Sequence, residues 1–135
     1  MREAKYEIIF SDNLDPWLGG KCMYPFIPLL GKCKIIIKPK YKNDIGIHKH
    51  EIKHAEQYAN NFFHALKSTF SKTYRYNIEL EAYTEQIKVY KYSRIDQTEW
   101  IIDALVNKYN LNITRKQVVK DISIILQRMN NETDL

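Results

Sequence analysis

The chain contains little cysteine, glycine or proline, and it has no long hydrophobic run. Among 135 residues there are 2 cysteines, 4 glycines and 4 prolines. Two cysteines, Cys22 and Cys33, do not make the disulfide framework of a small secreted domain, so we expect reduced thiols. No apolar run approaches the roughly 20 residues of a membrane span, and the first residues lack the apolar core of a signal peptide. We therefore expect a cytoplasmic protein that has no membrane partner.

The composition is that of a globular protein, with 44% hydrophobic and 27% charged residues. A chain of this length can bury the core of one domain but not of two. The net charge of +5 is spread along the sequence, which favours solubility more than binding to nucleic acid. We expect one domain, and nucleic acid is not its expected partner.

The most informative stretch is His50-Glu51-Ile52-Lys53-His54, which matches the pattern HExxH. Neither proline nor glycine interrupts the chain between positions 47 and 70, and Asn43 or Asp44 can cap the start of a helix. Apolar residues at steps of three and four predict one helix that ends near Ser71, with a buried stripe. The stripe comprises Ile45, Ile52, Ala55, Ala59, Phe62, Phe63, Leu66 and Phe70.

On such a helix His50 and His54 share one face, and both imidazoles can bind one cation. Glu51 lies beside them, where it can take a proton from an attacking water. The same histidines could instead be surface groups on a basic helix, because a bare HExxH also occurs by chance. A third ligand would favour the metal site. A second helical pattern over 74–92 supplies Glu79 and Glu81, of which only one can face the metal, since they are two residues apart.

HExxH followed by Glu79-Leu80-Glu81-Ala82-Tyr83 resembles the gluzincin zinc metallopeptidases, especially the minigluzincins and short zincin-like proteins of phage genomes. The resemblance covers about residues 33–90. It implies one zinc ion held by His50, His54 and Glu79, with Glu51 as the general base of peptide-bond hydrolysis. Tyr83 stands where many gluzincins carry an aspartate that orients a ligand histidine.

Three further residues near the second motif are candidates for orienting a ligand or stabilising the transition state: Tyr83, Glu81 and Tyr76. Upstream, residues 32–38 predict a strand with lysines at both ends, which fits an exposed edge. In zinc peptidases of this type an extended peptide adds to such an edge, so we expect a peptide or protein substrate along 33–38. A plain structural strand fits the same residues.

The predicted fold is α+β, a minimal zincin-like domain with a small N-terminal sheet and about four helices. Residues 1–42 form strands and a loop, 43–92 the metal-binding helix pair, and 94–129 a C-terminal helical hairpin. In the loop 15–28, Trp17, Tyr24 and Phe26 either cover the mouth of the site or fill the core.

Two other functions fit the sequence. One is a zinc-stabilised binding module without activity, and the other is a basic helical domain that binds nucleic acid or a protein. The last two predicted helices resemble a helix-turn-helix, but interspersed acidic residues favour a structural hairpin.

Overall fold

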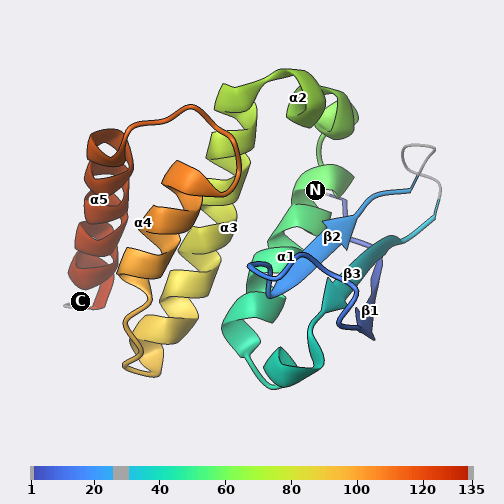
Figure 1. Cartoon of the computed structure of the whole chain (residues 1–135), viewed down its shortest axis with the longest axis horizontal. Helices are drawn as coiled ribbons and strands as arrows, with labels where there is room; N and C mark the ends of the chain where they lie inside the picture. The colour runs from blue at the N-terminus through green and yellow to red at the C-terminus, as the bar shows by residue number, and fades with distance from the viewer. Residues whose placement is uncertain (1, 26–30, 134–135) are drawn as a thin grey trace.

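The computed structural model describes residues 2–25 and 31–133. Within these ranges a three-stranded sheet is followed by five α-helices (Figure 1), so the predicted α+β class is confirmed. In chain order the elements are β1 (Tyr6–Phe10), β2 (Gly20–Met23), β3 (Cys33–Ile37), the short 3-10 helix η1 (Pro39–Tyr41), α1 (Ile45–Ala59), α2 (His64–Phe70), α3 (Lys72–Tyr92), α4 (Thr98–Asn107) and α5 (Arg115–Thr133).

The strand order is β1-β3-β2, with β1 parallel and β2 antiparallel to β3. The prediction that residues 33–38 form an edge strand is therefore wrong, because the backbone of β3 is paired on both sides. The loop prediction for 15–28 missed β2, a strand of 4 residues that begins at Gly20 and ends two residues before Pro25. A substrate peptide could add to β1 or β2, but not to β3.

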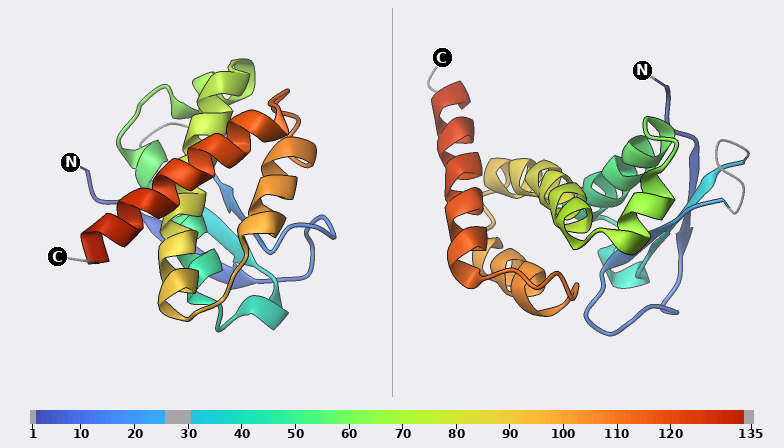
Figure 2. Two further views of the ribbon diagram at one scale, coloured as in Figure 1. Left: turned by 90° about the vertical axis from the view of Figure 1, so that its left-hand side faces the viewer. Right: turned by 90° about the horizontal axis from the view of Figure 1, so that it is seen from above.

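The sheet packs one face against α1 (Figure 2), and no helix of the described residues covers its other face. Alternate residues of β3 point toward α1, as the two-residue period of a strand requires. The cluster between these elements consists of Cys33, Ile35, Ile37, Ala55 and Tyr58. Asp44 caps α1 as predicted, since its Oδ1 accepts a hydrogen bond of 3.2 Å from the amide of Ile47.

The single long helix predicted to end near Ser71 is divided into α1 and α2. Asparagine side chains account for the break, because Asn61 binds a backbone amide that would otherwise continue the helix and Asn60 adds a second donor to a carbonyl of the last turn. Asn60 Nδ2 donates to the carbonyl of Glu56 at 2.9 Å, and Asn61 Oδ1 accepts from the amide of Phe63 at 3.1 Å. The predicted buried stripe is correct for Ala55 but wrong at both ends. The exposed members are Ile45, Phe62, Phe63, Leu66 and Phe70.

Helix α3 returns antiparallel to α1, as predicted, and α4 and α5 pack beyond it on the side away from the sheet (Figures 1 and 2). Thr114 caps the start of α5, because its Oγ1 accepts a hydrogen bond of 3.2 Å from the amide of Gln117. A second hydrophobic cluster joins these three helices. Its members include Tyr83, Ile87, Ile101, Leu105, Val118 and Ile122. The contact between α1 and α3 thus lies between two hydrophobic clusters.

We expect Ile35→Ala to lower the free energy of unfolding by about 2–5 kcal/mol, because it opens a cavity in the cluster beneath α1. Ile35 is 0% exposed, whereas Ile9 on the neighbouring strand is 41% exposed. Ile9→Ala is therefore the matched control, with an expected loss of less than about 1 kcal/mol. Urea unfolding followed by circular dichroism measures both, and equal losses would contradict this account of the core.

Candidate metal centre

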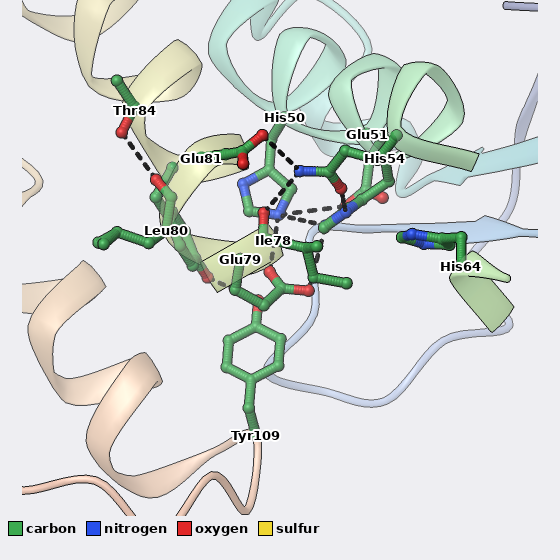
Figure 3. A network of polar contacts seen from close by, with 12 residues as sticks. His50, Glu51, His54, His64, Ile78, Glu79, Leu80, Glu81, Thr84 and Tyr109 are labelled. Atoms are coloured by element: carbon green, nitrogen blue, oxygen red, sulfur yellow. Dashed lines mark hydrogen bonds and ion pairs between the residues drawn. The ribbon is translucent and has the colours of Figure 1, made fainter. Parts of the chain in front are cut away.

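Two histidines of α1 and one glutamate of α3 meet between the two helices (Figure 3). His50 Nε2 lies 3.2 Å from Glu79 Oε2, and His54 Nε2 lies 3.1 Å from Glu79 Oε1. The two histidine Nε2 atoms are 3.2 Å apart. All three side chains are buried or nearly so, with 6%, 7% and 14% exposure for His50, His54 and Glu79. These three residues could hold a metal ion.

The separations between the ligand atoms fit one cation at their centre. Ligands about 2.0–2.1 Å from a tetrahedral ion lie roughly 3.3 Å from one another, close to the observed 3.1–3.2 Å. One buried oxygen, Glu79 Oε2, has no hydrogen-bond partner among the described residues. A buried carboxylate oxygen without a donor is costly, and a cation would remove that cost.

The structure distinguishes the two candidate third ligands. Glu79 faces the histidines, whereas Glu81 is exposed and accepts a hydrogen bond of 3.3 Å from Gln57 Nε2. A separation of two residues turns a side chain by about 200° around a helix, so the two carboxylates cannot face the same point. The prediction that Glu79 completes the ligand set is consistent with this geometry.

The buried charges shift one another's pKa strongly. Burial lowers the pKa of His54, but the nearby carboxylate of Glu79 more than offsets this and raises it to about 9. Burial likewise raises the pKa of Glu79, and the two histidines outweigh that effect, so its net pKa is well below the usual range. Without a cation, the protein holds a proton on His54 against an ionised Glu79. A metal ion would take the place of that proton.

Glu51 lies at the edge of the cluster, with Oε1 4.0 Å from His50 Nε2. Burial is the main cause that raises the pKa of Glu51, and the negative charge of Glu79 raises it further. His50 and His54 lower the pKa, but the net shift is upward. The backbone of β2 approaches it closely, because a Cβ on Gly20 would lie 3.1 Å from Glu51 Cγ and 3.2 Å from the carbonyl oxygen of Ile36. Glycine at position 20 therefore lets the edge strand pass directly over this carboxylate.

Gln57 orients one ligand, and the sequence interpretation missed it. Its Oε1 lies 2.9 Å from His54 Nδ1, and its Nε2 donates to the carbonyl of Ile78 at 3.0 Å and to Glu81. This arrangement places the proton of a neutral His54 on Nδ1 and leaves Nε2 free to bind a cation. The signal was present in the sequence, since a residue three positions after His54 shares its helix face.

The hydroxyl of Tyr83 does not hydrogen-bond to a ligand histidine, as the aspartate at this position of many gluzincins would. Its hydroxyl is paired with the hydroxyl of Tyr109 at 2.7 Å, while its ring packs edge-on to His50 with centroids 4.3 Å apart. His50 Nδ1 has no hydrogen-bond partner among the described residues. His50 is thus held by an aromatic wall, and not by the acceptor that usually orients a metal-binding histidine.

The tyrosines nearest the cluster are not all those expected from the sequence. The prediction that placed Tyr76 near the site is wrong, because its hydroxyl donates to Asp121 on α5 at 2.6 Å. Tyr24 and Tyr109 are the tyrosines that line the cavity with the three ligands. Burial raises the pKa of both hydroxyls, so both remain protonated and can donate. No local pattern marks Tyr109, which follows α4 and comes close only through the fold.

His64 lies behind Tyr24 and supports it. Its Nε2 is 2.9 Å from the hydroxyl of Tyr24, and its Nδ1 is 2.7 Å from that of Tyr74. Burial lowers the pKa of His64 to about 4, so the ring is neutral and accepts one hydrogen bond while donating the other. Figure 3 shows His64 apart from the three ligands, and it does not belong to the cluster.

Two adjoining cavities open on either side of His50 and Glu51. One, of about 230 Å³, contains the three ligands, and the other, of about 250 Å³, is walled by aromatic rings. Trp17 lines both and packs edge-on to Tyr109 at 5.0 Å. Trp17 and Tyr24 therefore lie at the site, while the third aromatic residue of the predicted cover, Phe26, lies outside the described residues.

Comparison of the chain with protein-family models, with curated proteins and with solved structures finds no match. The resemblance to gluzincins thus stays a prediction from the motifs. The geometry of His50, His54 and Glu79 is independent of that resemblance.

Glu79→Gln should reduce metal affinity by more than about 100-fold. This exceeds the loss usually seen when a residue that only hydrogen-bonds to a ligand is mutated. Glu81→Gln is the matched control, because it removes the same charge from the same helix, and it should keep near-stoichiometric metal. Elemental mass spectrometry of the purified variants measures the bound metal. Loss in the Glu81 variant with retention in the Glu79 variant would contradict the assigned ligand set.

Gln57→Leu should weaken metal binding by about 10–100-fold while leaving the fold intact, because His54 loses the acceptor that fixes its ring. Glu56→Leu changes the neighbouring, exposed position and should bind metal as the wild type does. Competition with a chromophoric chelator gives both affinities. Equal affinities for the two variants would show that Gln57 does not orient the ligand.

Proposed function

We propose that the protein is a zinc-dependent metallopeptidase that hydrolyses peptide bonds. The observation that carries this proposal is the buried placement of Glu51 beside the converging atoms of His50, His54 and Glu79. Two imidazoles and one carboxylate form a ligand set typical of catalytic zinc, which keeps one position open for water or substrate. A purely structural zinc site would have four protein ligands and no need for a buried acid next to it.

Bound zinc would lower the pKa of a water and polarise the scissile carbonyl. Glu51 accepts the proton of the attacking water and donates it to the leaving amine. Burial favours this role, because it raises the pKa of Glu51 toward the range in which a carboxylate can both take and give a proton. The hydroxyls of Tyr24 and Tyr109, which pair with His64 and Tyr83, belong to residues on the wall of the same cavity.

The substrate backbone would add to β2 and not to residues 33–38. The amide of Lys38 donates to the carbonyl of Gly19 at 3.0 Å, and the alternation of an antiparallel pair then turns the N–H and C=O groups of Gly20 and Cys22 to the free edge. Both residues also line the cavity of the three ligands. A peptide paired with this edge would pass over Glu51 with little dependence on its sequence.

The second cavity, of about 250 Å³, also supports a peptidase, because one substrate side chain could bind there beside the reacting bond. Its wall includes Tyr83, Tyr90, Trp100 and Tyr109, and it shares His50 with the first cavity. Aromatic walls favour a large apolar or aromatic side chain.

One observation favours a second candidate, a zinc-stabilised binding module without hydrolytic activity. His50 Nδ1 has no acceptor, and the ring of Tyr83 occupies the place beside it. A ligand held by packing alone is oriented less strictly than catalysis usually requires. This module would bind zinc and peptide and would cleave nothing.

Glu51→Gln separates the two functions. The variant should bind zinc as the wild type does, and its rate of peptide hydrolysis should fall by at least about 100-fold, because the proton acceptor is lost. Mass spectrometry of a broad peptide mixture, incubated with zinc-loaded protein, measures the cleavage.

Glu56→Gln removes the same charge from an exposed position of α1 and should leave the rate unchanged. Zinc-loaded wild type that cleaves no more than the Glu51 variant would exclude the peptidase. Retained zinc together with peptide binding would then support the inactive module.

A further inference from the structure

Four large apolar side chains stand exposed on the loop that precedes α2 and on α2 itself. They form the α2 patch, which consists of Phe62, Phe63, Leu66 and Phe70, with 57%, 55%, 57% and 80% exposure. Phe63 is the N-cap of α2, and Leu66 and Phe70 follow at steps of three and four, so these three share one side of the helix. Phe62 precedes them in the turn, with its ring centroid 5.1 Å from that of Phe63. A contiguous group of exposed apolar side chains marks a contact surface more often than a scattered one.

The exposure follows from the way α2 is anchored. His64 is 0% exposed, and its two ring nitrogens are held by Tyr24 and Tyr74. One turn later Ser68 Oγ donates back to the carbonyl of His64 at 2.7 Å. The inward face of α2 is therefore polar and hydrogen-bonded, and the apolar face is turned outward. If α2 rotated to bury its apolar side chains, His64 would lose its hydrogen bonds to both Tyr24 and Tyr74.

The charged residues on α2 and at the start of α3 are of one sign. Every charged residue between positions 57 and 78, the neutral His64 apart, is basic: Lys67, Lys72 and Arg75. The backbone amide of Arg2 donates to Asn60 Oδ1 at 2.9 Å, so Arg2 and the acidic Glu3 that follows it also lie near the turn. The nearest acid on α1, Glu56, is 3.6 Å from Lys53 and is paired with it.

We propose that the α2 patch docks the protein on the surface of a bilayer that contains anionic lipid. Phenylalanine and leucine side chains would enter the boundary between headgroups and acyl chains, and the surrounding lysines would contact lipid phosphates. The proposed contact is peripheral. No helix of the described residues is long and apolar enough to cross a membrane.

Other occupants fit the patch less well. A second copy would place basic residues opposite basic residues, and the patch exposes only roughly 450 Å² of apolar surface, about half of what each partner of a stable interface buries. Single-stranded nucleic acid binds in basic grooves with stacked rings. Here the patch lies on a helix and its preceding turn, and the rings of Phe62 and Phe63 are nearly perpendicular at 85°, so they do not form a stacked pair.

The test is co-sedimentation of the full chain with vesicles of phosphatidylcholine alone and of phosphatidylcholine mixed with phosphatidylglycerol. The wild type should sediment with the mixed vesicles, and the bound fraction should fall as salt is raised. Phe63→Ser/Phe70→Ser should weaken the apparent affinity by about tenfold or more, because two apolar groups are lost from the contact. Lys67→Glu/Lys72→Glu should weaken it by a similar factor on the mixed vesicles.

Each variant has a matched control. Tyr92→Ser removes a ring that is 93% exposed at the opposite end of α3 from the patch, and it should bind as the wild type does. Lys40→Glu/Lys42→Glu changes the net charge equally at η1, on the far side of the molecule (Figure 1). It should retain most of the binding. Circular dichroism verifies that every variant is folded.

Three results would overturn the proposal. One is a wild type that sediments with neither kind of vesicle. Another is equal loss in the patch variants and their controls, which would assign the binding to net charge alone. The third is that the patch binds a different partner while the vesicles stay unbound. Fluorescence anisotropy would detect binding of a labelled oligothymidylate, and sedimentation velocity would detect a dimer.

Discussion

The contact between α1 and α3 buries four ionisable side chains where two helices meet, and the rest of the site depends on how their charges are balanced. His50, Glu51 and His54 come from one helix and Glu79 from the other. Taking such groups out of water costs several kcal/mol each unless partners compensate. Hydrogen bonds from Gln57 and packing against Tyr83 satisfy part of that need, and a cation among the three converging ligands would satisfy most of the remainder. Binding of a metal ion there would therefore be coupled to the packing of α1 on α3.

Much of the site could be predicted from the sequence because its geometry follows from helix periodicity. A spacing of four places His50 and His54 on one face, and a short connection lets α3 return so that Glu79 meets them. The choice of Glu79 over Glu81 needed the resemblance, since periodicity alone only says that one of them faces away. Tyr109 could not be predicted, because it reaches the site through the packing of α4 on α3 and no local pattern marks such a contact.

The fold class was predictable for the same reason, whereas the order of the strands was not. Composition, a β-rich start and capped helical patterns give an α+β chain. Strand order depends on which backbone edges meet, and lysines at the ends of β3 fit an edge and a centre equally. The division of α1 from α2 was also hidden, because Asn60 and Asn61 end the helix through side-chain hydrogen bonds and not through proline or glycine.

The exposed face of α2 and the buried site have one cause. Apolar periodicity predicts which residues share a face of a helix but not which face is buried. In most helices the apolar face is the buried one. In α2 the buried face is set by His64, whose buried ring would lose its hydrogen bonds to Tyr24 and Tyr74 if the apolar side turned inward. Because Tyr24 lines the cavity of the ligands, the same histidine supports the wall of the site and keeps the α2 patch in solvent. A helix oriented against its own hydrophobic pattern is stable only when such a polar anchor holds it, and the apolar surface left outside is then available to a partner.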